Sequence, residues 1–263
     1  MKLLTLNCHS WQEEDQLEKI RHLAETIKSE DYDVIALQEV SQHRASKDYK
    51  DNLKEENFLV VLLKELEKLN VNEYDSVWDY AHIGYDVYEE GVCLLSKHPI
   101  VDKESFIISK CQSMENWKTR KIVKCTITYN DELIDFYSCH LGWWADDEEP
   151  FSAQMDKLYE IINPSRQSFL LGDFNNNACI RNEGYDYMKS LGLIDTYDLA
   201  VEKDSGMTVK GKIAGWEENK ENLRLDLIMT NKPLQVKSSK VIFNGKNKQV
   251  VSDHYGVQVE IIK

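Results

Sequence analysis

The chain has 263 residues, of which 42% are hydrophobic and 10% are aromatic. This composition excludes a disordered chain, and the length fits one large α/β or β-sandwich domain over residues 1–263. The 46 acidic and 32 basic residues leave a net charge of −14. Because an acidic surface repels the phosphate backbone, we do not expect long nucleic acid as the partner, although a local basic groove or a bound metal ion would override the overall charge.

None of the six cysteines belongs to a CxxC pair, which argues against a thiolate zinc site. Four of them, Cys8, Cys93, Cys125 and Cys139, lie in or beside apolar runs, where cysteine behaves as a small hydrophobic residue. The N-terminal "MKLLTLNCHSW" lacks the features of a signal peptide, and no stretch approaches the roughly 20 apolar residues of a membrane span. We therefore expect a reduced, soluble, cytoplasmic protein without a membrane partner.

The first half of the chain alternates predicted strands and helices. "KLLTLN" (2–7) predicts a strand, and apolar residues at helical spacing predict a helix over 13–30. "DVIALQEV" (33–40) is typical of a strand buried on both faces. A helix over 58–69 and strands over 76–84 and 91–100 follow.

The second half begins with a predicted hairpin. Strands over 119–130 and 132–141 meet at the turn Asn130–Asp131. Further elements are expected as a helix near 151–162, a strand at 168–172, a helix near 183–191 and strands near 223–230, 236–243 and 254–262. With no linker or repeat, the pattern predicts one α/β domain of two mixed β-sheets packed face to face, with helices outside.

Polar side chains recur at the ends of these predicted strands. Asn7, Glu39, His140 and Asp173 with Asn175 each close a strand, Asp226 lies in the motif "LRLDLI", and Asp253 with His254 precedes the last strand. A single such residue indicates only a turn, but six strand ends of this kind indicate a site built on a rigid scaffold.

The residue types in this set fit one chemistry. Asn7, Glu39 and Asp253 offer the hard oxygen ligands that suit Mg²⁺ or Mn²⁺. His140 and His254 can transfer protons or stabilise negative charge, and the remaining acids can fix an imidazole or orient a water. The sum predicts hydrolysis of a phosphate ester.

The motifs "LNCHSW", "IALQEV", "SCHLGWW", "LGDFNNN", "LRLDLIMTN" and "VSDHYGV" resemble, in order, those of the endonuclease/exonuclease/phosphatase superfamily, which includes pancreatic deoxyribonuclease and neutral sphingomyelinases. The resemblance runs from residue 7 to residue 254. It implies a deoxyribonuclease-like, four-layered α/β sandwich. It also implies a metal-dependent hydrolase of phosphoric esters.

The same resemblance implies roles for individual residues. Asn7 and Glu39 would bind the divalent metal, with Asp253 nearby. Asp173 would activate or orient the attacking water, and Asn175 would help to hold the water or the phosphate.

The resemblance also implies roles for two of the histidines. His254 would contact a phosphoryl oxygen and pair with Asp226. A structural pairing of Asp226 with Arg224 is the alternative. His140 would lie near the leaving group. The other five histidines, His9, His22, His43, His82 and His98, are expected to be surface or structural residues.

Two further assignments rest on weaker matches. Arg120 matches a family arginine that approaches the phosphate, but Lys118 and Lys121 stand beside it. A carboxylate before the strand "GVCLLS", either Glu89 or Glu90, would orient His140, and the sequence does not decide between the two.

The substrate is predicted from the residues after His140. Trp143 and Trp144 offer aromatic faces for a pyranose ring, and the acids Asp146, Asp147, Glu148 and Glu149 could accept hydrogen bonds from its hydroxyls, with a core tryptophan and a solvated acidic loop as the alternative. "LTLNCHSWQEE" and "HIGYDVYEEG" also resemble a branch of cytoplasmic maltose 6'-phosphate phosphatases. The expected function is thus an Mg²⁺-dependent sugar-phosphate phosphomonoesterase. The alternatives are a metal-dependent nuclease, a sphingomyelinase-like phosphodiesterase and a non-catalytic binding module.

Overall fold

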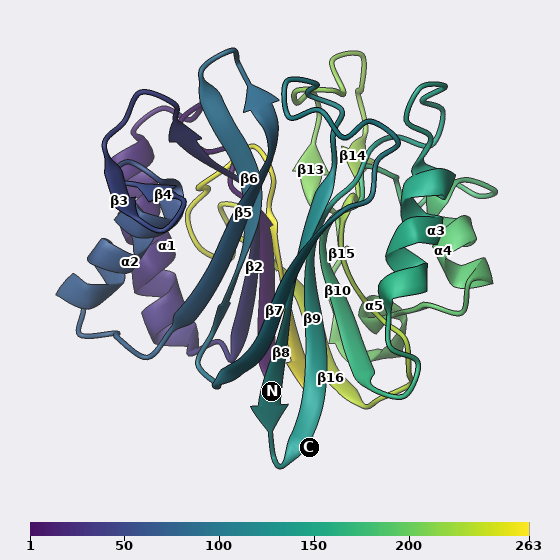
Figure 1. Ribbon diagram of the computed structural model, residues 1–263. Coiled ribbons are helices and arrows are strands. Elements are labelled where there is room, and N and C mark those ends of the chain that lie inside the picture. Colours follow the sequence, from purple (N-terminus) through teal and green to yellow (C-terminus); the bar gives the residue numbers. More distant parts are fainter. Residues whose placement is uncertain (263) are drawn as a thin grey trace.

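Two β-sheets pack face to face, and helices cover their outer faces, so that the chain forms four layers (Figure 1). The structure is a computed structural model that describes residues 1–262. It confirms the predicted fold class, a four-layered α/β sandwich with mixed sheets. None of the helices within the described part of the chain is long and apolar enough to cross a membrane.

The first sheet has seven strands and is mixed. Its order is β12 (Ala200–Lys203), β16 (Val236–Ile242), β17 (Gly256–Ile261), β1 (Lys2–Asn7), β2 (Val34–His43), β6 (Tyr88–Ser96) and β5 (Asp75–Gly84). β1 runs parallel to β2 and antiparallel to β17, so the ends of β1 and β2 and the start of β17 lie at the same edge.

The second sheet has six strands. Its order is β11 (Ile194–Asp195), β15 (Asp226–Thr230), β10 (Gln167–Asp173), β9 (Glu132–His140), β8 (Lys121–Tyr129) and β7 (Ile100–Ile107). β10 is parallel to β9 and antiparallel to β15, which pairs Asp173 with His140 on one side and with Asp226 on the other. Two short ribbons, β3 (Asp48–Lys50) with β4 (Leu53–Lys54) and β13 (Val209–Lys210) with β14 (Asn222–Leu223), complete the strands.

The central strands are apolar on both faces because each sheet is covered on both sides. Leu3 of β1 and Val34 of β2 point into the layer between the sheets, where they meet Val123 and Phe136. Alternate residues of the same two strands point to the other side, into the core under α1 (Gln16–Glu30) and α2 (Phe58–Lys68). The second sheet is covered by α3 (Phe151–Ile161) and α4 (Gly184–Ser190), and the short α5 (Thr196–Leu199) follows β11.

Several element boundaries differ from the predicted ones. The helix expected over 13–30 begins only at Gln16, after a loop in which His9, Trp11 and Asp15 have positive φ angles. The strand expected over 223–230 is divided at Arg224–Leu225 into β14 and β15. The edge strand β7 was not predicted, because its middle residues are exposed and carry no apolar alternation.

The edge opposite the two chain termini gathers the polar strand ends (Figure 1). β1, β9 and β10 end there at Asn7, His140 and Asp173, and β15 begins there at Asp226. The face-to-face packing of the sheets therefore brings the ends of sequence-distant strands together, as the strand-end pattern predicted.

Gly172 allows β9 and β10 to pair at this edge, because a Cβ atom on it would collide with the carbonyl oxygen of Cys139. We expect Gly172→Ala to lower the free energy of unfolding by about 2–3 kcal/mol, as an inserted carbon does in a packed site. Gly192→Ala serves as the control. A Cβ atom at Gly192 would meet open space, so the left-handed φ of 92° is the source of strain in this variant. That variant should lose about 1 kcal/mol. Urea unfolding measures both, and equal losses would show that the collision at Gly172 is relieved by a small backbone shift.

Candidate active site

A cavity of about 370 Å³ opens at the polar edge of the two sheets. Seven of the predicted site residues line it: Glu39, Arg120, His140, Trp143, Asp173, Asn175 and His254. Asn7 and Asp226 lie directly behind this lining, hydrogen-bonded to Glu39 and His254 respectively. Asp253 and Trp144, the remaining two predicted site residues, also lie outside the lining.

Asp173 stands at the centre of the cavity floor. Its Oδ2 atom lies 3.8 Å from Nε2 of His140 and 3.8 Å from Nε2 of His254, and it accepts a hydrogen bond of 3.2 Å from the side-chain amide of Asn7. Its Oδ1 atom accepts the backbone N–H of Asn175 at 2.8 Å. A carboxylate held on both oxygens and flanked by two imidazoles is well placed to orient a small polar molecule.

The ring orientation of His254 is fixed by Asp226. Nδ1 of His254 lies 2.9 Å from Oδ2 of Asp226, which leaves Nε2 directed at Asp173. Burial, the largest influence, lowers the pKa of His254, but Asp226 and Asp173 together raise this pKa well above its ordinary value. Arg224 pairs with Asp195 at 2.7 Å, so Asp226 is the partner of His254 and not of Arg224.

His140 is in the opposite electrostatic state. Burial and the nearby guanidinium of Arg120 lower the pKa of His140 to about 4, so that its imidazole is neutral at pH 7. The site therefore holds one cationic and one neutral imidazole on either side of Asp173. Environments that push two pKa values apart in this way give two similar groups different roles.

Two carboxylates, Glu39 and Glu90, lie close together beside His140. Glu90 is buried, and its Oε1 atom lies 3.3 Å from Nε2 of His82, while the other candidate, Glu89, binds Gln42 away from the cavity. Burial works to raise the pKa of Glu90, but His82, His140 and Arg120 outweigh it and lower this pKa to about 2. Glu90 is thus the carboxylate near His140, and His82, expected to be structural, also lines the cavity.

Glu39 has the chemistry of a cation ligand. Burial and the charge of Glu90 raise the pKa of Glu39 to about 8, although its Oε1 atom accepts a 2.8 Å hydrogen bond from Asn7. Glu39, Glu90 and His140 offer ligand atoms within 4.8 Å of one another. Two carboxylates that repel each other in a desolvated cleft fit a divalent cation, because the cation would neutralise both.

Asn7 lies beside Glu39, and the binding of a metal by these two residues stays a prediction. Its Oδ1 atom accepts the backbone N–H of His9, and its Nδ2 atom donates to Glu39 and Asp173. The side chain links the two sheets at the floor of the site, where Glu39 and Glu90 offer carboxylate oxygens.

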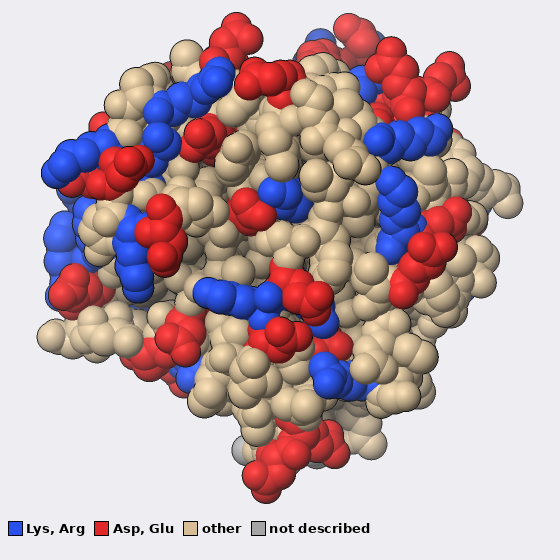
Figure 2. All heavy atoms as spheres, in the orientation of Figure 1, with Lys and Arg blue, Asp and Glu red and all other residues tan. Residues whose placement is uncertain are grey.

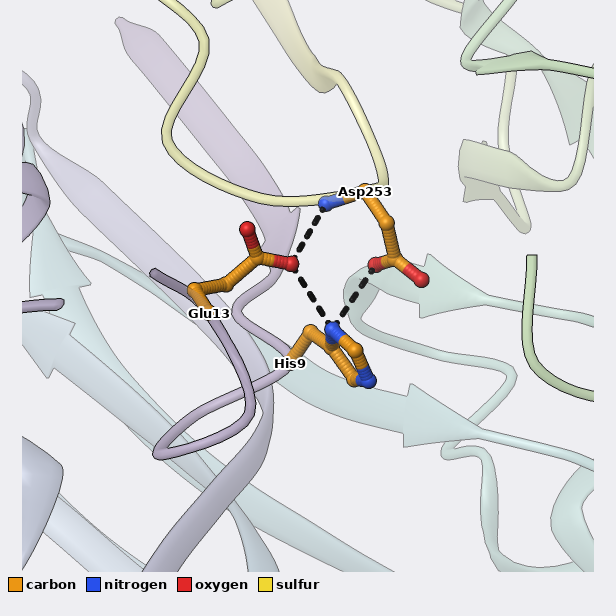
Figure 3. A group of neighbouring side chains, drawn as sticks. All are labelled: His9, Glu13 and Asp253. Atoms are coloured by element: carbon orange, nitrogen blue, oxygen red, sulfur yellow. Dashed lines mark hydrogen bonds and ion pairs between the residues drawn. The ribbon is translucent and has the colours of Figure 1, made fainter. Parts of the chain in front are cut away.

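Asp253 lies in a second cluster, with His9 and Glu13 (Figure 3). Nδ1 of His9 is 2.7 Å from Oε1 of Glu13 and 3.6 Å from Oδ1 of Asp253. Glu13 also accepts the backbone N–H of Asp253 and pairs with Lys19 at 2.6 Å. The sequence placed Asp253 near the Asn7–Glu39 pair, and in the structure the charge of Asp253 helps to raise the pKa of Glu39. The structure also joins Asp253 to His9, which was expected to be a surface or structural residue.

The two tryptophans after His140 lie in different environments. Trp143 lines the cavity, and the guanidinium of Arg120 lies 5.9 Å from the centre of its ring. Trp144 packs against Phe151 and Tyr187 in the core beneath α3 and α4. A turn begins at Trp144, and the two neighbouring side chains therefore enter different surroundings.

Of the four acids after Trp144, three are occupied by other contacts. Glu149 is buried and accepts the backbone N–H groups of Lys110 and Cys111. Asp146 and Glu148 pair with Lys118 at 2.9 and 2.8 Å. These acids shape the loop wall instead of facing a ligand.

Arg120 is a buried cation that faces the cavity. Its Nη1 atom donates to the carbonyl of Trp117 at 3.0 Å, and its Nε atom is buried without a partner. Lys118 and Lys121 are committed to ion pairs with other acids, Lys121 with Asp79 at 2.9 Å. Arg120 is therefore the one of the three basic residues that lines the cavity and has donor capacity to offer an anion.

The loop between β13 and β14 closes one side of the site, and no motif or periodicity predicts this. Nε1 of Trp216 donates to Oδ1 of Asn175 at 3.1 Å, while Nδ2 of Asn175 donates to the carbonyl of Leu141 at 2.9 Å. Both ends of the Asn175 amide are thus fixed. Gly215 of this loop also touches Trp143, since a Cβ on it would lie 2.6 Å from the indole ring.

The shifted pKa of Glu39 makes cation binding depend on pH. We expect Mg²⁺ or Mn²⁺ to raise the melting temperature of the wild type, and the rise to grow between about pH 6 and pH 8, because protons compete with the cation for Glu39 at lower pH. Glu39→Gln should remove most of the rise. Glu89→Gln, whose carboxylate lies outside the cavity lining, should behave as the wild type, and an unchanged rise in Glu39→Gln would exclude Glu39 as a ligand.

The pair His254–Asp226 gives a second prediction, in which stability falls as the pH rises. The pKa of His254 is raised, so its contribution to stability is present below the ordinary value of about 6.5 and is lost as the pH rises through the folded value. Asp226→Asn should bring the NMR titration midpoint of the His254 ring down, because burial then acts with less opposition. A midpoint unchanged by Asp226→Asn would mean that Asp226 does not charge this imidazole.

The chain is similar to several known proteins in sequence or in fold. The structure of an endonuclease/exonuclease/phosphatase family protein from Leptotrichia buccalis has 42% sequence identity to this chain and a TM-score of 0.94, with 100% of both chains covered. A mannosyl-6-phosphatase from Bacteroides thetaiotaomicron has 18% identity and a TM-score of 0.70, also over 100% of both chains, and shows likeness of fold. Sphingomyelinase C from Bacillus cereus is 30% identical over 173 residues, which are 62% of this chain.

The chain spans about half the length of this curated sphingomyelinase, 47% of it. The family match is broader, because residues 4–254 fit the Endonuclease/Exonuclease/phosphatase family and include the strand ends that carry the cavity. The chain belongs to the Endonuclease/Exonuclease/phosphatase family.

Proposed function

We propose that the protein is a cytoplasmic, Mg²⁺-dependent phosphomonoesterase that hydrolyses a sugar phosphate, with maltose 6'-phosphate as the expected substrate and maltose and phosphate as products. One observation carries the proposal. The cavity combines a floor of charged and hydrogen-bonding groups, which suits a phosphoryl group, with a wall that contains Trp117 and Trp143, which suits a sugar ring.

The cationic groups of the floor would bind the phosphoryl group. His254, protonated at neutral pH, and Arg120, with a free Nε–H, would each donate to a phosphoryl oxygen. These are the positions where negative charge increases during the reaction, so the two contacts would strengthen in the transition state.

Asp173 would orient the water that attacks phosphorus. In the reaction, the water oxygen bonds to phosphorus, the bond from phosphorus to the sugar oxygen breaks, and the sugar oxygen receives a proton. His140, neutral at pH 7, lies across Asp173 from His254 and would face the leaving group. Each of these roles uses an atom that already points to the centre of the cavity.

Glu39 and Glu90, with the imidazole of His140 nearby, would hold the divalent cation. When bound, this cation supplies Lewis-acid stabilisation of the phosphoryl charge, and Mg²⁺ and Mn²⁺ both suit such an oxygen-rich set.

Three observations support a sugar phosphate as the substrate. The net charge of −14 disfavours long nucleic acid, and on the face in Figure 2 the Lys and Arg side chains among the described residues are interspersed with Asp and Glu without forming a continuous tract. The fold is shared with a mannosyl-6-phosphatase. The wall residue Trp143 presents an indole ring beside Arg120.

A phosphodiesterase is the second candidate, because sphingomyelinase C is 30% identical over 173 residues. A sphingomyelin-like substrate would place a phosphodiester over the same floor. A nuclease activity and a chain that binds without catalysis are the further alternatives.

A parallel assay tests the proposal. Maltose 6'-phosphate, p-nitrophenyl phosphate, sphingomyelin and plasmid DNA are each incubated with the protein, with Mg²⁺ and with a chelator. We expect Mg²⁺-dependent release of phosphate, fastest from the sugar ester. Asp173→Asn should retain the wild-type melting curve and lower turnover by about 10²–10⁴-fold, the range for loss of a general base or water-orienting group.

The outcomes separate the candidates. Cleaved sphingomyelin or nicked DNA with no phosphate from the sugar ester would replace the proposal by a phosphodiesterase. Turnover unaffected by Asp173→Asn would remove Asp173 from the reaction. No turnover of any substrate would favour a binding module.

A further inference from the structure

Trp117 stands at the mouth of the cavity with 53% of its surface exposed, which is unusual for so large an apolar side chain. Its ring centre lies 6.0 Å from that of the more buried Trp143, at an interplanar angle of 63°. The two indoles therefore form a continuous aromatic wall that runs from the floor of the cavity to solvent.

The loop that carries Trp117 is held in place by polar contacts. The carbonyl of Trp117 accepts Nη1 of Arg120, so the backbone of the exposed residue is anchored to the cation on the floor. Nζ of Lys118 lies 5.7 Å from the centre of the Trp117 ring and is itself fixed by Asp146 and Glu148. A ligand that stacks on an aromatic ring held in this way loses little free energy to ordering the protein.

The opposite side of the cavity limits what Trp143 can accept. Gly215 approaches the ring of Trp143, and Arg120 lies over the same ring, so much of that indole is already covered. Trp117 keeps 53% of its surface exposed although Lys118 lies over its ring. Tyr85, also 53% exposed, and the carboxylate of Glu217 line the same cavity. Aromatic rings with hydrogen-bonding groups nearby are the features that recognise a sugar ring.

We propose that Trp117 is the subsite for a second sugar ring, the ring that does not carry the phosphate, so that the protein selects disaccharide phosphates over monosaccharide phosphates. This inference rests on the proposed function, because it assumes that the phosphoryl group lies over the floor beside Arg120. The first ring then packs beside Trp143, and the wall continues to Trp117. The role assigned to Trp144 from the sequence passes to Trp117.

Kinetics with matched substrates test the subsite. The values of kcat/KM are measured for maltose 6'-phosphate, glucose 6-phosphate and p-nitrophenyl phosphate with the wild type, Trp117→Ala and Trp117→Phe. Trp117→Ala should lose roughly five- to tenfold on the disaccharide phosphate, the size of one aromatic contact, and change less than about twofold on the other two. Trp117→Phe should recover most of the loss. Tyr49→Ala removes an equally exposed aromatic residue far from the cavity lining and should change none of the three values.

Equal losses on all three substrates, or an unchanged value for maltose 6'-phosphate, would overturn the subsite while leaving the phosphatase proposal intact. If instead no sugar phosphate is hydrolysed, the proposed function fails, and the subsite is judged by binding alone. In that case calorimetric titration of unphosphorylated maltose into the wild type and Trp117→Ala decides. Binding that is weakened by the substitution supports the subsite, and absence of binding to the wild type overturns it.

Discussion

The site depends on keeping several charged side chains out of water at the edge where the two sheets meet. Glu39 and Glu90 lie side by side, yet the pKa of one is raised to about 8 and that of the other is lowered to about 2. The difference comes from their partners. Glu90 has His82 and Arg120, whereas Glu39 is left with the amide of Asn7 and a repelling neighbour. The fold thus maintains one partly buried carboxylate, Glu39, with no Lys or Arg side chain of the described residues paired to it. Such a carboxylate beside a second one favours the binding of a divalent cation.

Backbone strain at the site adds to the free-energy cost of keeping these charged side chains out of water. Glu39, Asn175 and His9 have φ angles of 52°, 49° and 42°, in the left-handed region that non-glycine residues rarely adopt. Such residues cost on the order of 1–3 kcal/mol each. The apolar layer between the sheets and the two cores under the helices stabilise the fold enough to hold them. A Glu39 in regular strand conformation would present its carboxylate at a different angle, and the bulge in β2 between Leu37 and Val40 is what turns it.

The sequence predicts the scaffold better than the walls of the cavity. Apolar runs and polar strand ends follow from local rules, so the layers and most of the floor could be predicted. The choice between Glu89 and Glu90 could not, because it depends on the phase of β6 against β2 and β5. Both of those strands contain a register shift next to the site, one of them between Tyr80 and His82. The same shift helps to explain why His82 was missed: one added residue moves a side chain to the other face.

The wall residues illustrate a second limit. Trp143 and Trp144 are neighbours of one type, and only the packing of α3 and α4 assigns Trp144 to the core. Trp117 and Trp216 lie in loops. The bond from Trp216 to Asn175 joins residues far apart in the sequence, and the carbonyl of Trp117 is bonded to Arg120, which approaches the ring of Trp143. Loops carry no periodicity, so no pattern in the sequence placed these two indoles at the site.

The separation of the site into strand ends and loops bears on function. The groups suited to the chemistry stand on strand ends, where sheet packing fixes them, and the groups suited to choosing a substrate stand on the loops that carry Trp117 and Gly215. A relative at 18% identity shares the fold, and a shared fold alone does not determine the substrate. The reaction class follows from the family, but the substrate must be derived from the loop residues of this chain, and Arg120, which touches both the floor and Trp117, is the residue that connects the two.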